Sequence, residues 1–414
     1  MNNNPNYKKG IRREIILLLY ENTAVSYTAL KIASKDWKNT HKKLREMERD
    51  GIISIDHCKK QDIDSMVTLK NYKINKQIYE PYLSVEYHDG YEMESVQHIN
   101  IVKQKKYMRD SEVMCAARYA NILTLRTEKV LLDKPEQAYK KIDRSHAYFY
   151  SSKEIKNCIN GDHYIDYDKI SFTRINGVII SAGGIYPVYN IRTNLIEWSK
   201  SSEIKTQHYI RHILELRMEG CEAQNRYLDI NSTVIMVKDM KLAVRMIAHD
   251  SLYYRKMASK KRINATPLIG IDYTYEHMYV LTQSSEDLKL LEIMTTPSWE
   301  IKMKSMYLDK ESREESKMTS IVCDGVKNGT YIYFFCIPDI VRFKQFVDRV
   351  TREETPDKFV VYCFRHQKAF VEEVVGPYVK IKTTDINKLY EEYMNIYKKE
   401  LTERGEQYFH IKKQ

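Results

Sequence analysis

The segment KKLREMERDGIISI, residues 42–55, decides how the N-terminal part of this chain folds. Its apolar spacing predicts a helix over 37–50, and Gly51 follows at the position where a left-handed residue commonly ends a helix. The run 52–55 is mostly apolar and predicts a strand that begins as soon as the helix has ended. The segment therefore indicates a helix joined directly to a β-strand.

Two helices and one strand surround this segment in the sequence. Apolar residues at helical spacing predict helices over 11–21 and 27–33, and Ser26 is a suitable N-cap for the second of them. After the polar loop 57–65, the run 66–69 returns as a second strand. Three helices followed by a β-hairpin, in this order, are the layout of a winged helix-turn-helix domain.

The predicted third helix carries the candidate DNA contacts. In this motif the helix enters the major groove with its N-terminal half nearest the bases, while the wing reaches phosphate or the minor groove. The inward face is expected to hold Leu44 and Met47, together with Trp37 and Thr40. The candidate contacts are Lys38, Thr40, His41, Lys42, Lys43, Arg45 and Arg49 on the helix, and Lys59 and Lys60 on the wing. The alternative is a winged helix that contacts protein.

Composition narrows the classes of protein that the chain can belong to. Its 414 residues include 67 Lys and Arg against 56 Asp and Glu, and residues 1–75 contain 15 of the former and 9 of the latter. This excess permits nucleic-acid binding without requiring it. No apolar run approaches the roughly 18 residues of a membrane helix. The polar N-terminus is unlike a signal peptide and the seven cysteines are scattered, so we expect a cytoplasmic protein with reduced thiols.

The middle of the chain predicts a mixed α+β domain. A helix is expected over 94–122, and its cluster of Lys103, Lys105, Lys106 and Arg109 either lengthens the DNA-binding face or lies on a solvated side. The segment AYFYSSKEIKNCI, residues 147–159, predicts a strand and then a helix capped by Ser151 or Ser152. Hairpin signals at Asn176-Gly177 and Gly183-Gly184 predict an antiparallel meander. Its strands would be 170–175, 178–182 and 185–190, followed by a helix and a buried strand over 233–237.

The last hundred residues alternate between strands and helices. Strands are predicted over 331–336, 359–364 and 379–383, and helices over 340–350, 366–375 and 386–401. This alternation predicts parallel strands and a three-layer α/β domain. We therefore divide the chain into a winged helix (1–75), a helical linker region (76–145), an α+β domain (146–320) and a C-terminal α/β domain (321–414).

Catalytic chemistry has little support in the residue pattern. His208 and His212 are one turn apart, but Tyr209 replaces the glutamate of a zinc protease, so a structural or solvent-exposed role is expected. A nuclease core would place an acid on one hairpin strand and Glu-x-Lys on the next, holding Mg²⁺. The strand positions hold Ser171, Thr173, Val188 and Tyr189 instead. Glu203 is expected in the first turn of a helix, where an acid suits the helix dipole.

The predicted winged helix, FYSSKEIKN (149–157) and SFTRINGVIISAGGIYPVYNIRTNLIEWSKSSEIKTQHYI (171–210) together resemble a known group of proteins. These are uncharacterised winged-helix proteins of Firmicutes plasmids and integrative conjugative elements, similar in turn to the replication-relaxation family. The resemblance implies a winged helix joined to a core of the PD-(D/E)xK restriction-endonuclease type. Since Ser171 and Thr173 replace the acids, it implies a degenerate core that serves binding. It further implies a role in replication, mobilisation or transcriptional control.

We therefore expect a sequence-specific double-stranded DNA-binding protein of a plasmid or conjugative element, without enzymatic activity or cofactor. The expected partners are duplex DNA, other plasmid or conjugation proteins and a second copy of the chain, with no membrane. Two alternatives stay open. One is a protein-interaction scaffold, and the other is a metal-dependent nuclease or relaxase that uses Mg²⁺ with Asp166, Asp168, Glu203 and Lys205.

Overall fold

The computed structural model shows a mixed α/β protein with three β-sheets in its described part. The residues that it describes are 10–34, 36–57, 64–70, 101–132, 140–143, 145–159, 174–192, 200–218, 230–248, 275–350, 356–377, 379–406 and 408. Within these ranges, none of the helices combines the length and the apolar character that a membrane crossing needs.

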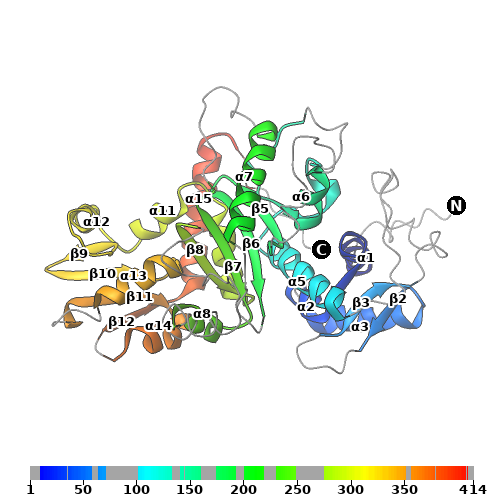
Figure 1. Ribbon diagram of the computed structural model, residues 1–414, viewed down its shortest axis with the longest axis horizontal. Helices are drawn as coiled ribbons and strands as arrows, with labels where there is room; N and C mark the ends of the chain where they lie inside the picture. Colours follow the sequence, from blue (N-terminus) through cyan, green and yellow to red (C-terminus); the bar gives the residue numbers. More distant parts are fainter. Residues whose placement is uncertain are drawn as a thin grey trace.

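The N-terminal unit, residues 10–70, contains three helices and a small antiparallel sheet (Figure 1). Its elements are α1 (Ile11–Asn22), β1 (Ala24–Ser26), α2 (Tyr27–Ala33), α3 (Trp37–Arg49), β2 (Ile53–Asp56) and β3 (Met66–Leu69). The helices and the hairpin lie within one residue of their predicted bounds. Ser26 caps α2 by accepting a hydrogen bond from the Ala29 amide, and Gly51 has φ of 72°, as expected for the end of α3.

One strand of this unit was not predicted. The sequence predicts helices over 11–21 and 27–33 with only a break at 22–25 between them, whereas Ala24–Ser26 form β1 and pair with β3, giving the order β1-β3-β2. A three-residue strand has too little length to show periodicity, so only its partner reveals it.

Helix α5 (Ile101–Tyr119) joins the N-terminal unit to the rest of the molecule. It packs against α2 and β1 on one side and against β6 (Gly184–Ile191) on the other. Its Ser111 hydroxyl accepts a hydrogen bond from the buried Ser26 amide, and Arg118 pairs with Glu14 of α1 at 3.3 Å. The N-terminal unit is therefore fixed to the central sheet rather than tethered by a linker.

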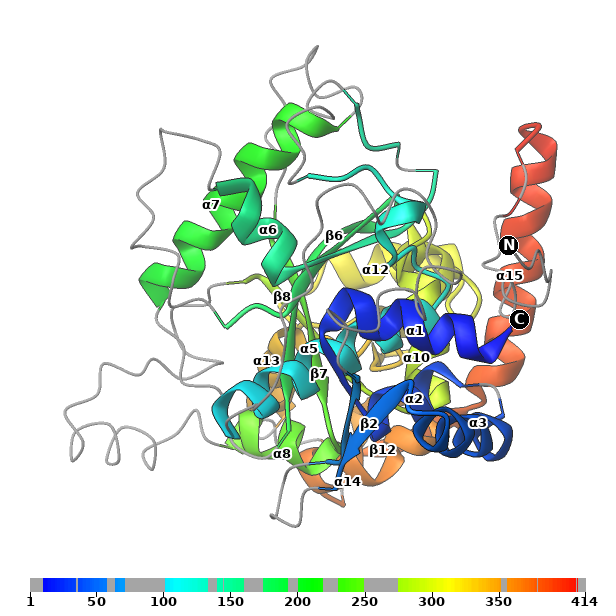
Figure 2. The same ribbon diagram turned by 90° about the vertical axis from the view of Figure 1, so that its right-hand side faces the viewer.

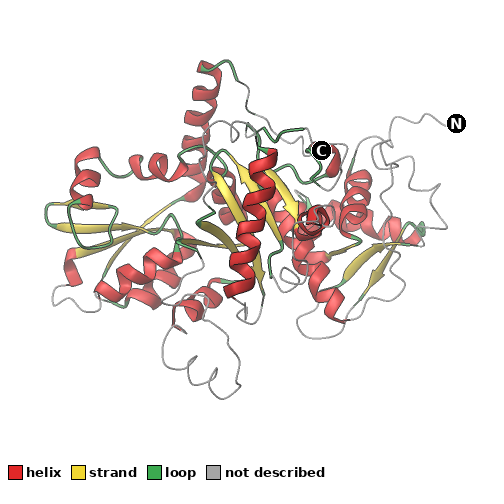
Figure 3. Cartoon of the chain, turned by 45° about the horizontal axis from the view of Figure 1, so that its top comes forward, coloured by secondary structure: helices red, strands yellow, loops and turns green. Residues whose placement is uncertain are grey.

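The central sheet has five strands in the order β4-β5-β6-β7-β8. The first two pairs are antiparallel and the last two are parallel. Besides β6, its strands are β4 (Tyr148–Ser151), β5 (Gly177–Ser181), β7 (Ser232–Val237) and β8 (His277–Thr282). Helices α6 (Ser152–Ile159), α7 (Lys200–Arg217) and α8 (Met240–Ala248) connect them, and Figure 3 shows helices lying across the strands of both larger sheets.

The antiparallel meander forms, but with a different outer strand from the one predicted. Its first strand is β4, which pairs with β5, whereas residues 174–176 are outside any strand and 170–173 lie outside the described residues. Asn176-Gly177 consequently makes no hairpin. A Cβ on Gly177 would lie 2.4 Å from the Phe149 ring, so glycine is needed there for close approach to β4 rather than for a turn. The turn at Gly183-Gly184 is confirmed, since Ser181 pairs with Gly184.

The C-terminal sheet is a three-layer α/β arrangement, as predicted. Strands β10 (Thr330–Phe334), β11 (Phe359–Phe364) and β12 (Lys380–Thr384) are parallel, and the unpredicted β9 (Gly325–Lys327) adds an antiparallel edge. Tyr333 and Phe335 pack on the side of α13 (Ile340–Val350) and α14 (Lys368–Val375). Phe334 belongs to the opposite apolar cluster, with Leu389 of α15 (Ile386–Glu403).

The central and C-terminal sheets share their apolar cores. The Val280 amide of β8 donates to the Pro338 carbonyl at 3.0 Å, and α10 (Ser285–Met294) packs against α15. Helices α11 (Trp299–Ser305) and α12 (Lys310–Lys317) follow α10. Figure 2 shows α7 and α15 on opposite sides of the molecule, in agreement with their places in the two apolar clusters. Contacts therefore cross the division that the sequence suggested at residue 320.

Candidate nucleic-acid interface

Local sequence fixes the orientation of α3. Asp36 caps the helix by accepting a hydrogen bond from the Asn39 amide at 3.1 Å. Thr40, Leu44 and Met47 recur at helical spacing and are buried against the rest of the N-terminal unit. The helix therefore presents its opposite side to solvent.

The exposed side of α3 is a stripe of four cations, here named the α3 stripe: Lys38, Lys42, Arg45 and Arg49. Their spacings of four, three and four residues place them in one row along the helix. Arg49 has 80 % of its side chain exposed. The row faces water along the whole length of the helix, as a groove-binding surface must.

Lys43 lies beside the α3 stripe and has a partner. Its ammonium is 2.7 Å from Glu46, and this hydrogen bond lowers the pKa of the Glu46 carboxyl. Arg12 of α1 approaches the same carboxylate at 3.4 Å and Asp50 at 3.0 Å. Lys43 thus belongs to an ion-pair network that holds α1 against α3, and it is less available to DNA than the stripe.

Two of the predicted contacts on α3 are placed differently from the expectation. Thr40 is only 6 % exposed and its hydroxyl lies 2.7 Å from that of Ser34, so its inward placement is confirmed and the prediction that it contacts a base is wrong. His41 is half-buried, with its ring 5.6 Å from that of Trp37 and 6.0 Å from that of Tyr27. It packs in an aromatic group beside the stripe. Lys59 and Lys60 lie outside the described residues.

The residues proposed for a nuclease do not converge where the structure describes them. Glu203 of α7 is fully buried and accepts hydrogen bonds from the Arg174 amide at 2.9 Å and the Tyr189 hydroxyl at 2.6 Å. The hydroxyls of Tyr189 and Tyr275 are 2.8 Å apart, and burial raises the pKa of both phenols. Lys205 instead faces solvent. Glu203 therefore holds the central sheet to α7 and has no open side for a metal ion.

The other candidate residues of this chemistry are two acids and two histidines. Asp166 and Asp168 lie outside the described residues. His208 and His212 are exposed on α7, which agrees with the solvent-exposed role expected for them. Among the residues that the structure describes, no group of three His, Cys, Asp or Glu side chains is arranged to hold a metal ion.

The sequence analysis missed a buried polar group between α5 and the strand ends of the central sheet. We name it the α5–β6 cluster, consisting of Asp110, Glu112, Asn176, Asn190, Arg192 and Gln283. The Asn190 amide donates to Glu112 at 2.9 Å, and Arg192 forms an ion pair with the same carboxylate. The Asn176 amide donates to Asp110 at 2.7 Å. Burial raises the pKa of both carboxyl groups.

The α5–β6 cluster lies directly beyond Val188 and Tyr189, two of the strand positions at which a nuclease core would need an acid or a base. Asn190 and Arg192 lie two positions apart at the end of β6, which is the spacing of a Glu-x-Lys motif. An amide therefore replaces the carboxylate of that motif, and a guanidinium replaces its ammonium. Two features of the sequence mark the cluster: the polar pair Ser111-Glu112 among the apolar residues 113–117, and Asn190 within an apolar strand.

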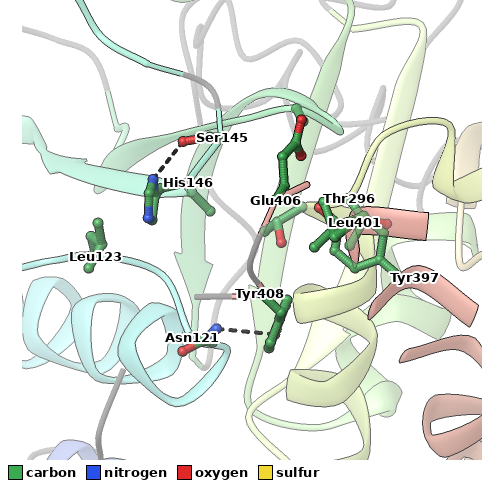
Figure 4. A pocket seen from close by; sticks show the side chains of 12 residues that line it. Asn121, Leu123, Ser145, His146, Thr296, Tyr397, Leu401, Glu406 and Tyr408 are labelled. Carbon is green, nitrogen blue, oxygen red and sulfur yellow. Dashed lines mark hydrogen bonds between the residues drawn. The ribbon is translucent and has the colours of Figure 1, made fainter. Parts of the chain in front are cut away.

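A cavity of about 250 Å³ lies between the end of α5 and the C-terminal segment (Figure 4). Tyr408 closes one side of it by accepting a hydrogen bond from the Asn121 amide at 3.1 Å and donating one to Glu292 at 2.5 Å. Ser145 and His146 line the other side, with the hydroxyl 2.7 Å from the ring nitrogen. The cavity is remote in sequence from the α3 stripe and contains none of the predicted site residues.

Comparison with known proteins adds no relative. The chain matches no family model, no curated protein and no solved structure. Its function is therefore inferred from its own residues and from the resemblance carried by its motifs.

Proposed function

We propose that this chain is a double-stranded DNA-binding protein whose residues 10–70 form a winged helix with α3 as its recognition helix. The α3 stripe is the observation that carries the proposal. Four exposed cations in one row, opposite a buried apolar face, match the electrostatic footprint of a helix that enters the major groove.

The chemistry of the stripe suits both parts of a DNA contact. Lys38 and Lys42 lie in the N-terminal half, which points at base edges, and a lysine or arginine there can bind guanine. Arg45 and Arg49 lie further along, where contacts to phosphate replace condensed counterions. The order α1-β1-α2-α3-β2-β3 supports this docking because the β2–β3 hairpin follows α3 as a wing would.

The biological setting proposed for this binding comes from the resemblance alone. It is the control of replication, mobilisation or transcription in a plasmid or conjugative element, in the cytoplasm. The partners proposed beside duplex DNA are other plasmid or conjugation proteins and a second copy of the chain. No catalytic step or cofactor forms part of the proposal.

Duplex binding measured by fluorescence anisotropy over a series of salt concentrations tests the proposal. Log affinity should fall against log salt with a slope of about −4 to −6 if about five to seven phosphates are contacted. Arg45→Ala with Arg49→Ala should flatten the slope by about two units, whereas Lys310→Ala with Lys388→Ala, an equal loss of charge on exposed side chains of α12 and α15, should leave it unchanged. A full-length chain that binds no duplex at low salt would leave the scaffold alternative instead.

A cleavage assay separates the proposal from the nuclease alternative. Supercoiled DNA incubated with the protein and Mg²⁺ or Mn²⁺ should stay intact while binding is readily measured. Divalent-dependent nicking that is lost in Asp166→Asn with Asp168→Asn, and retained in Arg45→Ala, would favour the nuclease. Glu203→Ala is a poor diagnostic variant here, because removing this buried carboxylate disturbs the fold itself.

A further inference from the structure

Cations from three separate segments gather beside the α5–β6 cluster. We name them the central cations: Lys106, Arg109, Lys156 and Arg174. The first two lie one turn apart on α5, the third is in the last turn of α6, and the fourth precedes β5. The hydrogen bond between Asn176 and Asp110 joins α5 to the segment before β5, and α6 packs against β5.

The central cations are close enough to repel one another. Burial lowers the pKa of Lys156, the charges of Lys106 and Arg174 lower it further, and the charges of Asp110 and Glu203 act against them. Burial likewise lowers the pKa of Arg109, where Arg174 and Arg192 act in the same direction and Asp110 and Glu112 oppose them. Holding like charges together costs free energy, so such a group is typical of a site that receives an anion.

Internal acids offset only part of this charge. In the part of the chain that the structure describes, none of the central cations has its side chain in an ion pair. The nearby acids are Asp110, which accepts from Asn176, Glu112, which is paired with Arg192, and Glu203, which accepts from Tyr189. The Nε of Arg192 is buried and lacks a hydrogen-bond acceptor among the described residues. The group therefore has donors and positive charge to offer.

Helix α5 connects the central cations to the predicted wing. Near its start, the Gln104 amide donates to Asp56 at the end of β2 at 3.2 Å, and the exposed Lys105 and Lys106 follow. Further along, α5 is bonded to Ser26 and packs against α2. Helix α5, which carries two of the central cations, is thus fixed both to the N-terminal unit and to the central sheet, and lies between them (Figure 1).

We infer that the central cations bind backbone phosphates of the same duplex that α3 contacts, beyond the segment covered by the N-terminal unit. The inference rests on the proposed function. Lysine and arginine side chains donate to phosphate oxygens and carry no sequence information in that role. The middle of the protein thereby lengthens the footprint and adds affinity for any sequence that flanks the recognised site.

The experiment compares full-length wild type with Lys106→Gln/Lys156→Gln on two duplexes that share one centre. The first has about 12 base pairs, little more than one helical turn, and the second about 36. The substitutions should weaken binding of the long duplex about tenfold near 0.1 M salt and flatten its salt slope by about two units. Binding of the short duplex should be unchanged. Lys310→Gln/Lys388→Gln removes the same charge elsewhere and should match wild type on both.

Four outcomes would overturn the inference, and the last of them would also overturn the proposed function. Equal binding of the long duplex by wild type and Lys106→Gln/Lys156→Gln would do so while leaving the proposed function intact. An equal loss of affinity for both duplexes, with the thermal unfolding midpoint of the variant unchanged, would mean that these lysines contact the same segment of DNA as α3. Stabilisation by inorganic phosphate that needs these lysines, without any length-dependent DNA effect, would assign a small anion to the group. Absence of duplex binding by wild type would remove both proposals together.

Discussion

The α3 stripe and the α5–β6 cluster use similar side chains in opposite surroundings. On α3, four cations face water, where salt screens them, and the ion pair of Arg49 with Asp50, at 3.9 Å, is exposed. Between α5 and β6, Glu112 and two asparagines are buried and the cluster is joined by hydrogen bonds of 2.7 to 2.9 Å. The difference teaches that burial, rather than residue type, decides whether a charged side chain is tied into the fold or left available to a partner.

The largest expected effect is that of Glu112→Ala. Glu112 is fully buried, and its loss leaves Arg192 as an uncompensated charge, removes the acceptor of the Gln283 amide and leaves the Asn190 amide only the Arg109 carbonyl. We expect the free energy of unfolding to fall by about 3–5 kcal/mol, measured as a shift of the urea unfolding midpoint. Glu112→Gln keeps the shape and part of the hydrogen bonding, and should lose less. If the alanine variant lost less than about 1 kcal/mol of stability, the α5–β6 cluster would not be a stabilising feature, and the contrast with the α3 stripe would be wrong.

Lys42→Ala should show the reverse behaviour. Its side chain is exposed on the α3 stripe, so the thermal unfolding midpoint should stay within error of wild type. Affinity for the recognised duplex should fall by about 1–3 kcal/mol if Lys42 meets a guanine. Lys310→Ala, on exposed α12, supplies the matched control for loss of one charge. Lower stability with unchanged affinity would mean that α3 has a structural role.

Asp36→Ala tests a residue that is exposed, like the α3 stripe, and also stabilises the fold, like the α5–β6 cluster. The residue is exposed, yet its carboxylate caps α3 through the Asn39 amide. Loss of the cap should lower stability by about 1 kcal/mol and weaken DNA binding slightly, because the first turn of the helix frays. Asp36→Asn retains an acceptor and should restore most of the stability. An alanine variant as stable as wild type would show that tertiary packing alone holds the start of α3.

The smallest effect should be a pH dependence at His277, whose side chain is 36 % exposed. Its hydrogen bond to Asp339, 2.7 Å long, raises its pKa above the ordinary 6.5. A raised pKa in the folded protein means that the stabilisation is complete below pH 6.5 and is lost as the pH rises through the folded value. The melting-temperature difference between wild type and His277→Gln should therefore shrink with rising pH. A difference that grows with pH would mean that His277 is held neutral.

Sequence reasoning succeeded where structure is decided locally. The bounds of α2, α13 and β11 follow from caps and apolar spacing within each segment, and the structure has them as predicted. It failed where the structure of a segment depends on a partner far along the chain. Strand β1 exists because β3 pairs with it, and Gly177 lies against Phe149 of β4 rather than in a turn. The candidate contacts on α3 were visible as a basic helix, but the α5–β6 cluster joins residues about 80 positions apart and leaves no local pattern.

The hydrogen bonds of Tyr408 have a consequence for how the chain is made. Glu292 of α10 is only 7 % exposed, and its carboxylate accepts from the hydroxyls of Tyr390 and Tyr408. Both tyrosines leave the ribosome after the N-terminal unit and after α10 itself. The seam between α5, α10 and α15 can therefore close only once residue 408 has been translated. A nascent chain stopped before residue 390 would expose this carboxylate and the apolar face of α10 to chaperones and proteases.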